Sequence, residues 1–300
     1  MIDVKKDLSE FMQLTGKSQR DISRESGLST SVISQFLSGT YSGDNKEVAN
    51  TLSKYLRVAK DRLNSQQSTA FNENLYNTQN VLYACNHAHI ENDIVLVCGD
   101  AGAGKTTALK LYAAENTGVI MVTCNSCTRS ATAVLKLILN NLGIQSINRK
   151  EILMNKLLER LRGTHYLVIL DEADHLTLDA LQAVRNLNDS AGVGIVLSGN
   201  DKIYRQMYSG QRGYEFDQIR TRIIVRKRVV NSYTPEEIES IFVNAPSDCI
   251  PYIMNLACRE SLRTAIKIFN LALEYAKAMN SKITLSILKS VKDELIGAEI

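Results

Sequence analysis

The residues with the clearest chemistry are Gly99–Thr106, which fit the spacing G-x-x-x-x-G-K-[ST]. Glycines at these positions allow a loop to curl so that its backbone N–H groups point inward at phosphate oxygens. In this pattern Lys105 reaches the β- and γ-phosphates of a nucleotide, and the Thr106 hydroxyl is a ligand for Mg²⁺. The alternative, a plain glycine-rich turn, is disfavoured because an apolar run precedes the loop and a helical pattern follows it. The predicted nucleotide-binding loop comprises Gly99, Asp100, Ala101, Gly102, Ala103, Gly104, Lys105, Thr106 and Thr107.

Polar residues follow two later apolar runs. Asp171 and Glu172 come directly after Leu167–Leu170, so Asp171 would hold the magnesium shell and Glu172 would polarise the attacking water as a general base. An ordinary acidic strand end is the alternative, but the position downstream of a phosphate loop favours a site. Asn200 follows Ile195–Gly199 and would orient the water if its strand lies next to the Asp171 strand. The alternative role for Asn200 is that of a turn-forming residue after glycine.

Four short apolar runs would position these residues. Each run is continuous rather than alternating, which is typical of strands buried on both faces of a parallel sheet. Amphipathic helical patterns lie between them, as at Val134–Leu142 and Leu153–Leu161. Strands that alternate with helices predict a three-layer α/β sandwich. The predicted strands are Ile94–Cys98, Val119–Thr123, Leu167–Leu170 and Gly194–Leu197.

The phosphate loop, the Asp-Glu pair and the strand-end asparagine resemble the AAA+ P-loop ATPases. The resemblance implies an ATP-hydrolysing α/β core that uses ATP and Mg²⁺, in which Asn200 is the first sensor residue. It also implies an arginine finger that acts on a neighbouring subunit's ATP, with Arg222 the first candidate and Arg220 the second; the alternative is a solvated basic strand edge. A second sensor arginine is expected in the helical lid. Arg263 fits that place, although Ser261 stands where the family has glycine.

Residues Gln19–Gly39 resemble the helix-turn-helix of phage repressors. Ser23 permits close helix contact, Gly27 makes the turn, and a second helix from Ser29 to Leu37 would face the major groove. The alternative is a helical bundle that docks another protein. The predicted inward-facing residues are Ile22, Leu28, Ile33 and Leu37. The predicted DNA contacts are Ser31, Ser34 and Gln35.

Net charge and the length of apolar runs indicate the cellular location, and segment patterns indicate the domains. The net charge is only +3, so any DNA-binding face must come from local clustering. No apolar run reaches the ~18 residues of a membrane span, and the N-terminus lacks the apolar stretch of a signal peptide, so we expect a cytoplasmic protein with no membrane partner. The predicted domains are a helix-turn-helix domain at 1–64, a linker at 65–72, an AAA+ core at 73–230 and a C-terminal helical lid at 231–300.

The order of helix-turn-helix, AAA+ core and short lid is uncommon, and it resembles the transposition protein B family of Mu-like phages over nearly the whole chain. The extension Asp174–Leu176 after the Asp-Glu pair narrows the AAA+ resemblance to this branch and to related transposon ATPases. The matching motifs are Glu25–Thr30, Gly43–Asn45, Val97–Gly99, Asp171–Leu176 and Gly199–Asn200.

The resemblance implies a protein of the bacterial host cell that binds ATP and assembles with itself as filaments on double-stranded DNA, with little sequence specificity. It would deliver this target to a transposase and stimulate it. DNA contacts are expected from Thr128 and Arg129, after the second strand, and from Arg149 and Lys150, at the start of the next helix. The excess of positive charge between residues 129 and 162 agrees with that expectation. A second basic stretch, 220–228, would serve either the subunit interface or DNA.

Three alternatives share parts of this sequence. A replication helicase loader or initiator would have the same core, but the N-terminal helix-turn-helix argues against most loaders. A transcription regulator that uses ATP as a switch would need a recognition helix that reads a defined operator. A scaffold that does not hydrolyse ATP is disfavoured because Lys105, Asp171 and Glu172 are all present.

Overall fold

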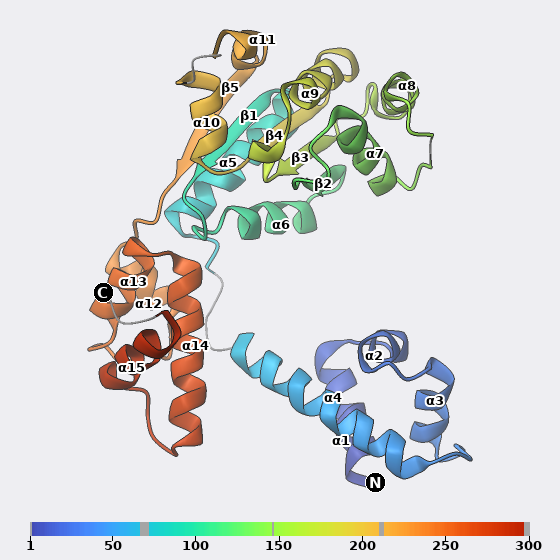
Figure 1. Cartoon of the computed structure of the whole chain (residues 1–300), viewed down its shortest axis with the longest axis vertical. Helices are drawn as coiled ribbons and strands as arrows, with labels where there is room; N and C mark the ends of the chain where they lie inside the picture. Colours follow the sequence, from blue (N-terminus) through green and yellow to red (C-terminus); the bar gives the residue numbers. More distant parts are fainter. Residues whose placement is uncertain (1, 67–71, 146, 210–212, 297–300) are drawn as a thin grey trace. The chain divides into compact units, whose positions relative to one another are not determined.

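The computed structural model describes residues 2–66, 72–145, 147–209 and 213–296 (Figure 1). Contacts divide the chain into two compact units. The first consists of residues 1–70, with the short segment 242–244 grouped with it, and the second of residues 71–241 and 245–300. The predicted linker at 65–72 begins inside a helix, and its residues 67–71 lie outside the described part of the chain.

The described residues of the first unit form four helices around one apolar core. Ser18 and Asp21 form a reciprocal capping box at the start of α2, and the Ser29 side chain caps α3. Gly27 joins these two helices with a φ of 78°, in the left-handed region that favours glycine. The helices are α1 (Ile2–Thr15), α2 (Gln19–Ser26), α3 (Thr30–Ser38) and α4 (Asn45–Gln66).

The predicted inward-facing residues of α2 and α3 do face this core. Ile22 and Ile33 are fully buried, and Leu28 and Leu37 are partly buried against the same cluster. The cluster also contains Phe11 and Phe36 from α1 and α3 and apolar residues of α4. The 3.6-residue spacing of apolar side chains therefore accounts for the packing of this unit.

A five-stranded parallel sheet in the order β2-β3-β4-β1-β5 forms the centre of the second unit. Every residue of β1, β3 and β4 is buried, as the continuous apolar runs predict. The fifth strand, which the apolar runs did not predict, alternates between buried and exposed residues and lies at the sheet edge. The strands are β1 (Ile94–Gly99), β2 (Val119–Thr123), β3 (Leu167–Asp171), β4 (Gly194–Ser198) and β5 (Ile223–Val229).

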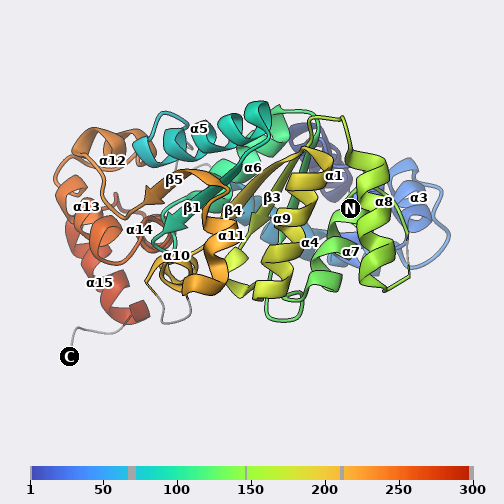
Figure 2. The same ribbon diagram turned by 90° about the horizontal axis from the view of Figure 1, so that it is seen from above.

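Helices cover both faces of the sheet, which makes the three layers that the alternation predicts (Figure 2). Val95 and Val97 pack with α5 (Tyr76–Glu91) and α6 (Lys105–Glu115) on one face. Ile94 and Leu96 pack into the other cluster, with helices of the opposite face. Successive side chains of a strand point to opposite faces, so one buried strand serves both layers. The opposite face carries α7 (Ala131–Asn141), α8 (Lys150–Leu161), α9 (Leu178–Ala191) and α10 (Asp201–Tyr208).

Further helices lie before and after β5 in the chain. A 3₁₀ turn, η1 (Ala173–His175), follows β3, and η2 (Gly213–Phe216) and α11 (Asp217–Arg220) precede β5. Among the described residues four helices follow β5, and Thr234 and Glu237 cap the first of them reciprocally. They are α12 (Pro235–Ile241), α13 (Ile250–Arg259), α14 (Leu262–Ala278) and α15 (Leu285–Ile296). Among the described residues, no helix is both long and apolar enough to cross a membrane.

Candidate nucleotide site and nucleic-acid interface

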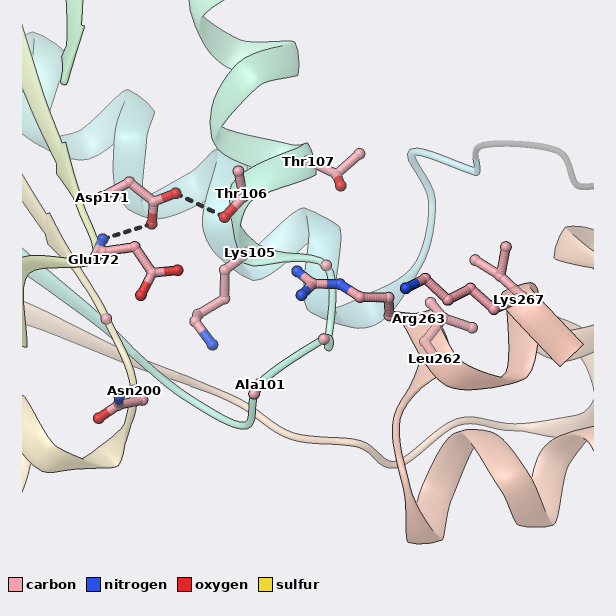
Figure 3. A pocket seen from close by; sticks show the side chains of 14 residues that line it. Ala101, Lys105, Thr106, Thr107, Asp171, Glu172, Asn200, Leu262, Arg263 and Lys267 are labelled. Carbon is pink, nitrogen blue, oxygen red and sulfur yellow. Dashed lines mark hydrogen bonds between the residues drawn. The ribbon is translucent and has the colours of Figure 1, made fainter. Parts of the chain in front are cut away.

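A cavity of about 390 Å³ lies where the phosphate loop, the ends of β3 and β4 and the start of α14 meet. Its volume is within the range of small-molecule sites. Figure 3 shows Lys105 and Glu172 pointing into the same space, and Arg263 reaching toward the loop from α14. Ten of the predicted site residues line this cavity, namely Ala101, Gly102, Gly104, Lys105, Thr106, Thr107, Asp171, Glu172, Asn200 and Arg263.

Lys105 is a partly buried cation held by the curled loop itself. Its Nζ donates to the carbonyl oxygens of Gly99, at 3.0 Å, and of Asp100, at 2.6 Å. Burial lowers the pKa of Lys105, and the nearby charges of Asp171 and Glu172 oppose that shift. A buried ammonium next to neutral carbonyls gains most from an anion, so the cavity suits a nucleotide phosphate.

Asp171, the last residue of β3, connects the phosphate loop to β4. It is only 2% exposed, and its oxygens accept from the hydroxyls of Thr106, at 2.7 Å, and Ser198, at 2.9 Å. The backbone N–H of Glu172 donates to it as well, at 3.0 Å. The register pairs Leu170 with Leu197, which brings the next residue of each strand together. A carboxylate and a hydroxyl at hydrogen-bond distance are the hard oxygen ligands that suit Mg²⁺, and these two would hold it.

Glu172 occupies an unusual backbone position. Its φ of 56° lies in the left-handed region, where a residue other than glycine is strained. The following turn, η1, starts from that conformation, while the Glu172 side chain stays exposed and lines the cavity. A solvent-accessible carboxylate beside the phosphate loop is placed where a general base could reach an attacking water.

Asn200 lies at the end of β4, which is adjacent to β3 as the role proposed for it requires. Its Oδ1 accepts from the N–H of Lys202 and caps α10, while its Nδ2 donates to Asp174 at 2.8 Å. Sequence reasoning did not find Ser198 or assign a role to Asp174. Both act across the β3–β4 junction, and no spacing along the chain reveals such a contact.

The phosphate loop contacts the segment that follows β5, both before and within its helices. The N–H of Arg263 donates to the Gly102 carbonyl at 3.3 Å, and the N–H of Asn231 donates to the Asp100 carboxylate at 2.8 Å. Lys267 lies one turn after Arg263 and lines the same cavity. Its spacing of four residues from Arg263 is the signal that could have identified it.

The two candidate finger arginines do not line this cavity. Arg222 is half exposed and donates to Asp189 at 2.9 Å. Arg220 is more covered, pairs with Asp217 and donates to the Met207 carbonyl. Arg222 is thus the more accessible of the two from outside the subunit.

The predicted DNA-contacting segments of the core converge on the start of α9. Thr177, which caps α9, donates from its N–H to the carbonyl of Arg129 at 3.0 Å. Lys150 pairs with Asp179 in the first turn of the same helix, at 2.8 Å. The side chains of Arg129 and Arg149 are exposed, and Thr128 is half-buried and bonds within its own loop. The structure therefore gathers these four residues around one helix end.

The predicted contacts of the first unit lie on the outer face of α3. Ser31, Ser34 and Gln35 are all exposed, and the Ser31 hydroxyl lies 2.9 Å from that of Ser29. This face is polar and uncharged.

Comparisons with known proteins agree with this site. Residues 89–207 match the family model of an AAA domain. The chain is 32% identical over 240 residues to the ATP-dependent target DNA activator B of Escherichia phage Mu. The matched region covers 80% of this chain and 76% of that protein. It is also 32% identical over 208 residues to the Mu-like prophage FluMu DNA transposition protein B of Haemophilus influenzae, covering 68% and 72% of the two chains.

Solved structures share the fold at low identity. The Aeropyrum pernix ORC2 protein in ADPNP–ADP complexes has a TM-score of 0.53 and 17% identity, over 73% of this chain and 66% of that one. The Drosophila ORC bound to DNA has a TM-score of 0.53 and 16% identity, over 79% and 66%. The predicted family and the predicted ATPase activity are thus confirmed: this chain is an AAA ATPase, and it belongs to the target DNA activator B family of Mu-like phages.

Proposed function

We propose that this ATPase binds double-stranded DNA with little sequence preference when it holds ATP and Mg²⁺, assembles with itself on that DNA, and delivers it to a transposase whose activity it stimulates. It would act in the cytoplasm of the bacterial host. The observation that carries the proposal is the convergence of four candidate DNA contacts on the start of α9, in the same core as the nucleotide cavity. The relatives named as target DNA activator and DNA transposition protein support the choice of target and partner.

In this proposal the side chains of the cavity divide the chemistry. Lys105 and Arg263 bind phosphates, Thr106 and Asp171 hold Mg²⁺, Glu172 activates water, and Asn200 orients it. Two features support this division: Lys105 is a partly buried cation, and Thr106 and Asp171 are already hydrogen-bonded. A bound Mg²⁺ would neutralise charge that develops on the phosphates during hydrolysis.

Self-assembly would complete the site. Arg222 lies outside the cavity of its own subunit and half exposed, which suits a finger that reaches a neighbour's ATP. The helices after β5 would act as the lid, since Arg263 contacts the phosphate loop through its backbone. Closing the lid on ATP would then favour the assembled form.

The first unit would supply an auxiliary DNA contact. Its α2–turn–α3 arrangement has the capping and turn residues of a helix-turn-helix, with Ser31, Ser34 and Gln35 exposed on the second helix. Since this face carries no positive charge, it would add little to phosphate binding.

Salt dependence of DNA binding tests the proposal. With ATP and Mg²⁺, the double variant Arg149→Ala/Lys150→Ala should bind random duplex DNA more weakly. The negative slope of log K against log[salt] should become shallower by about 2, because two phosphate contacts are lost. The matched control, Lys277→Ala/Lys282→Ala, removes the same charge from exposed residues of the C-terminal segment and should keep the slope. Equal slopes for the two variants would refute the assigned DNA surface. Binding confined to one defined sequence would instead favour a transcription regulator.

A further inference from the structure

Asp174 is a buried carboxylate that the proposed mechanism does not use. It lies in η1, is only 4% exposed, and accepts two hydrogen bonds from one residue. The backbone N–H of Asn200 donates to its Oδ1 at 3.2 Å, and Nδ2 of Asn200 donates to its Oδ2 at 2.8 Å. Burying a carboxylate is costly unless it is hydrogen-bonded, so this pair of contacts accounts for its place in the interior.

These contacts fix the orientation of the Asn200 amide. Its oxygen is committed to the N–H of Lys202, at 2.8 Å, and one hydrogen of Nδ2 is committed to Asp174. A primary amide has two N–H donors, so one donor is left for a ligand in the cavity. Without Asp174, no contact at the nitrogen would restrain rotation of the Asn200 amide group about the Cβ–Cγ bond.

The backbone at Gly199 leaves room for this arrangement. A Cβ at Gly199 would lie 2.7 Å from Oδ1 of Asp174. Side-chain Cβ atoms essentially never come within 3.0 Å of a neighbouring atom, so a larger residue would displace the carboxylate. The glycine before Asn200 thus lets the carboxylate reach the main chain of the next residue.

A metal site is the other role that the surroundings offer Asp174. One ligand atom each of Glu172, Asp174 and His175 lies within 4.8 Å of the others. Both Asp174 oxygens accept from Asn200, however, which holds this carboxylate toward Asn200. The contacts therefore favour Asn200 as the group that Asp174 serves.

We infer that Asp174 is a positioning residue for ATP hydrolysis, which holds the Asn200 amide so that its free N–H faces the reacting phosphate or water. The inference rests on the proposed role of Asn200. It extends that role to a residue that is not among those lining the nucleotide cavity.

The test is a double-mutant cycle on the full chain, with ATP turnover measured on random duplex DNA. Asn200→Ala should lower kcat about 100-fold, the size expected for a lost transition-state donor. Asp174→Ala should lower kcat about 10- to 100-fold, because a misplacement of about 1 Å has that effect, while the KM for ATP stays within about twofold. In the Asn200→Ala background, Asp174→Ala should change kcat by less than about twofold, since the residue it positions is gone.

Two further variants keep the test decisive. Asp174→Asn keeps the side-chain shape and one acceptor, so it should fold even if Asp174→Ala does not. Its kcat should lie between those of the wild type and Asn200→Ala. Asp293→Ala removes an exposed carboxylate of α15 and should behave as wild type. Melting curves of every variant separate a loss of fold from a loss of turnover.

Each contrary result has a distinct meaning. Independent, multiplicative losses in the double variant, or a normal kcat in Asp174→Ala while Asn200→Ala is slow, would overturn the inference alone. A normal kcat in Asn200→Ala would overturn both the inference and the proposed role of Asn200. A rise in kcat on adding Mn²⁺ or Zn²⁺ that Asp174→Ala abolishes would assign Asp174 to a metal instead.

Discussion

Replacing Gly102 with alanine tests how closely the phosphate loop is packed against the C-terminal helices. Gly102 has a φ of +73°, and an added Cβ would lie 2.8 Å from both Cβ and Oγ of Ser261, the residue that caps α14. The left-handed backbone costs alanine about 1–2 kcal/mol. Overpacking against Ser261 adds about 1–3 kcal/mol, so we expect a total destabilisation of about 2–5 kcal/mol.

A matched control separates the two contributions. Gly143 has the same φ of +73°, with nothing within 4 Å of an added Cβ, so Gly143→Ala should show the backbone cost alone. Ser261→Gly removes both crowding atoms and costs only a few tenths of a kcal/mol as a cap. A Cβ at position 102 would still lie 3.2 Å from Cβ of Arg263, so the double variant Gly102→Ala/Ser261→Gly should recover most, but not all, of the stability difference from Gly143→Ala.

The assay is calorimetric melting of the nucleotide-free full chain. The transition of residues 71–300 can be identified because ATP raises its Tm, as any ligand of the folded form does. Each kcal/mol shifts Tm by about 2–4 °C for a unit of this size, so Gly102→Ala should melt several degrees below Gly143→Ala. Equal Tm values for these two variants would refute the loop–helix packing.

Three further predictions concern the site and the DNA surface. Glu172→Gln should bind ATP and DNA but release phosphate at least about 100-fold more slowly, because the water loses its base; normal phosphate release would remove Glu172 from the mechanism. Since burial lowers the pKa of Lys105 below 10.5, the protonated form that binds phosphate is lost earlier as pH rises. ATP affinity measured by calorimetry should fall as pH approaches 10.5 from below, and Lys105→Arg should flatten that fall; the same profile in both proteins would contradict the assignment. Cys127 is the exposed cysteine of the loop before Arg129, so maleimide should label it first, and DNA with ATP should slow the labelling. An unchanged labelling rate would show that this loop does not approach DNA.

The strands that carry the site could be predicted because their chemistry is local. Continuous apolar runs identified β1 to β4 to within a residue or two, and the phosphate loop follows β1 as its spacing requires. β5 begins with only three apolar residues, Ile223–Val225, and Arg226, Lys227 and Arg228 follow them at the edge of the sheet, so its apolar run is too short to detect. From the sequence alone, a basic strand at the sheet edge cannot be distinguished from a basic loop.

The contacts that orient the site could not be predicted, because they depend on which strands are neighbours. Ser198 reaches Asp171 and Asp174 reaches Asn200 only once β3 pairs with β4. The same holds for the convergence of Arg129 and Lys150 on α9, which tertiary packing produces. Spacing along the chain identifies groups that act on the nucleotide, whereas the residues that hold those groups come from other elements.

ATP is proposed to control the assembly of this protein on DNA of any sequence. The most direct measurement is negative-stain electron microscopy of the full chain with random-sequence duplex DNA and Mg²⁺, with ATP in one sample and ADP in the other. We predict continuous protein filaments along the DNA with ATP and bare or sparsely bound DNA with ADP. Discrete particles, or the same coating with both nucleotides, would contradict the claim.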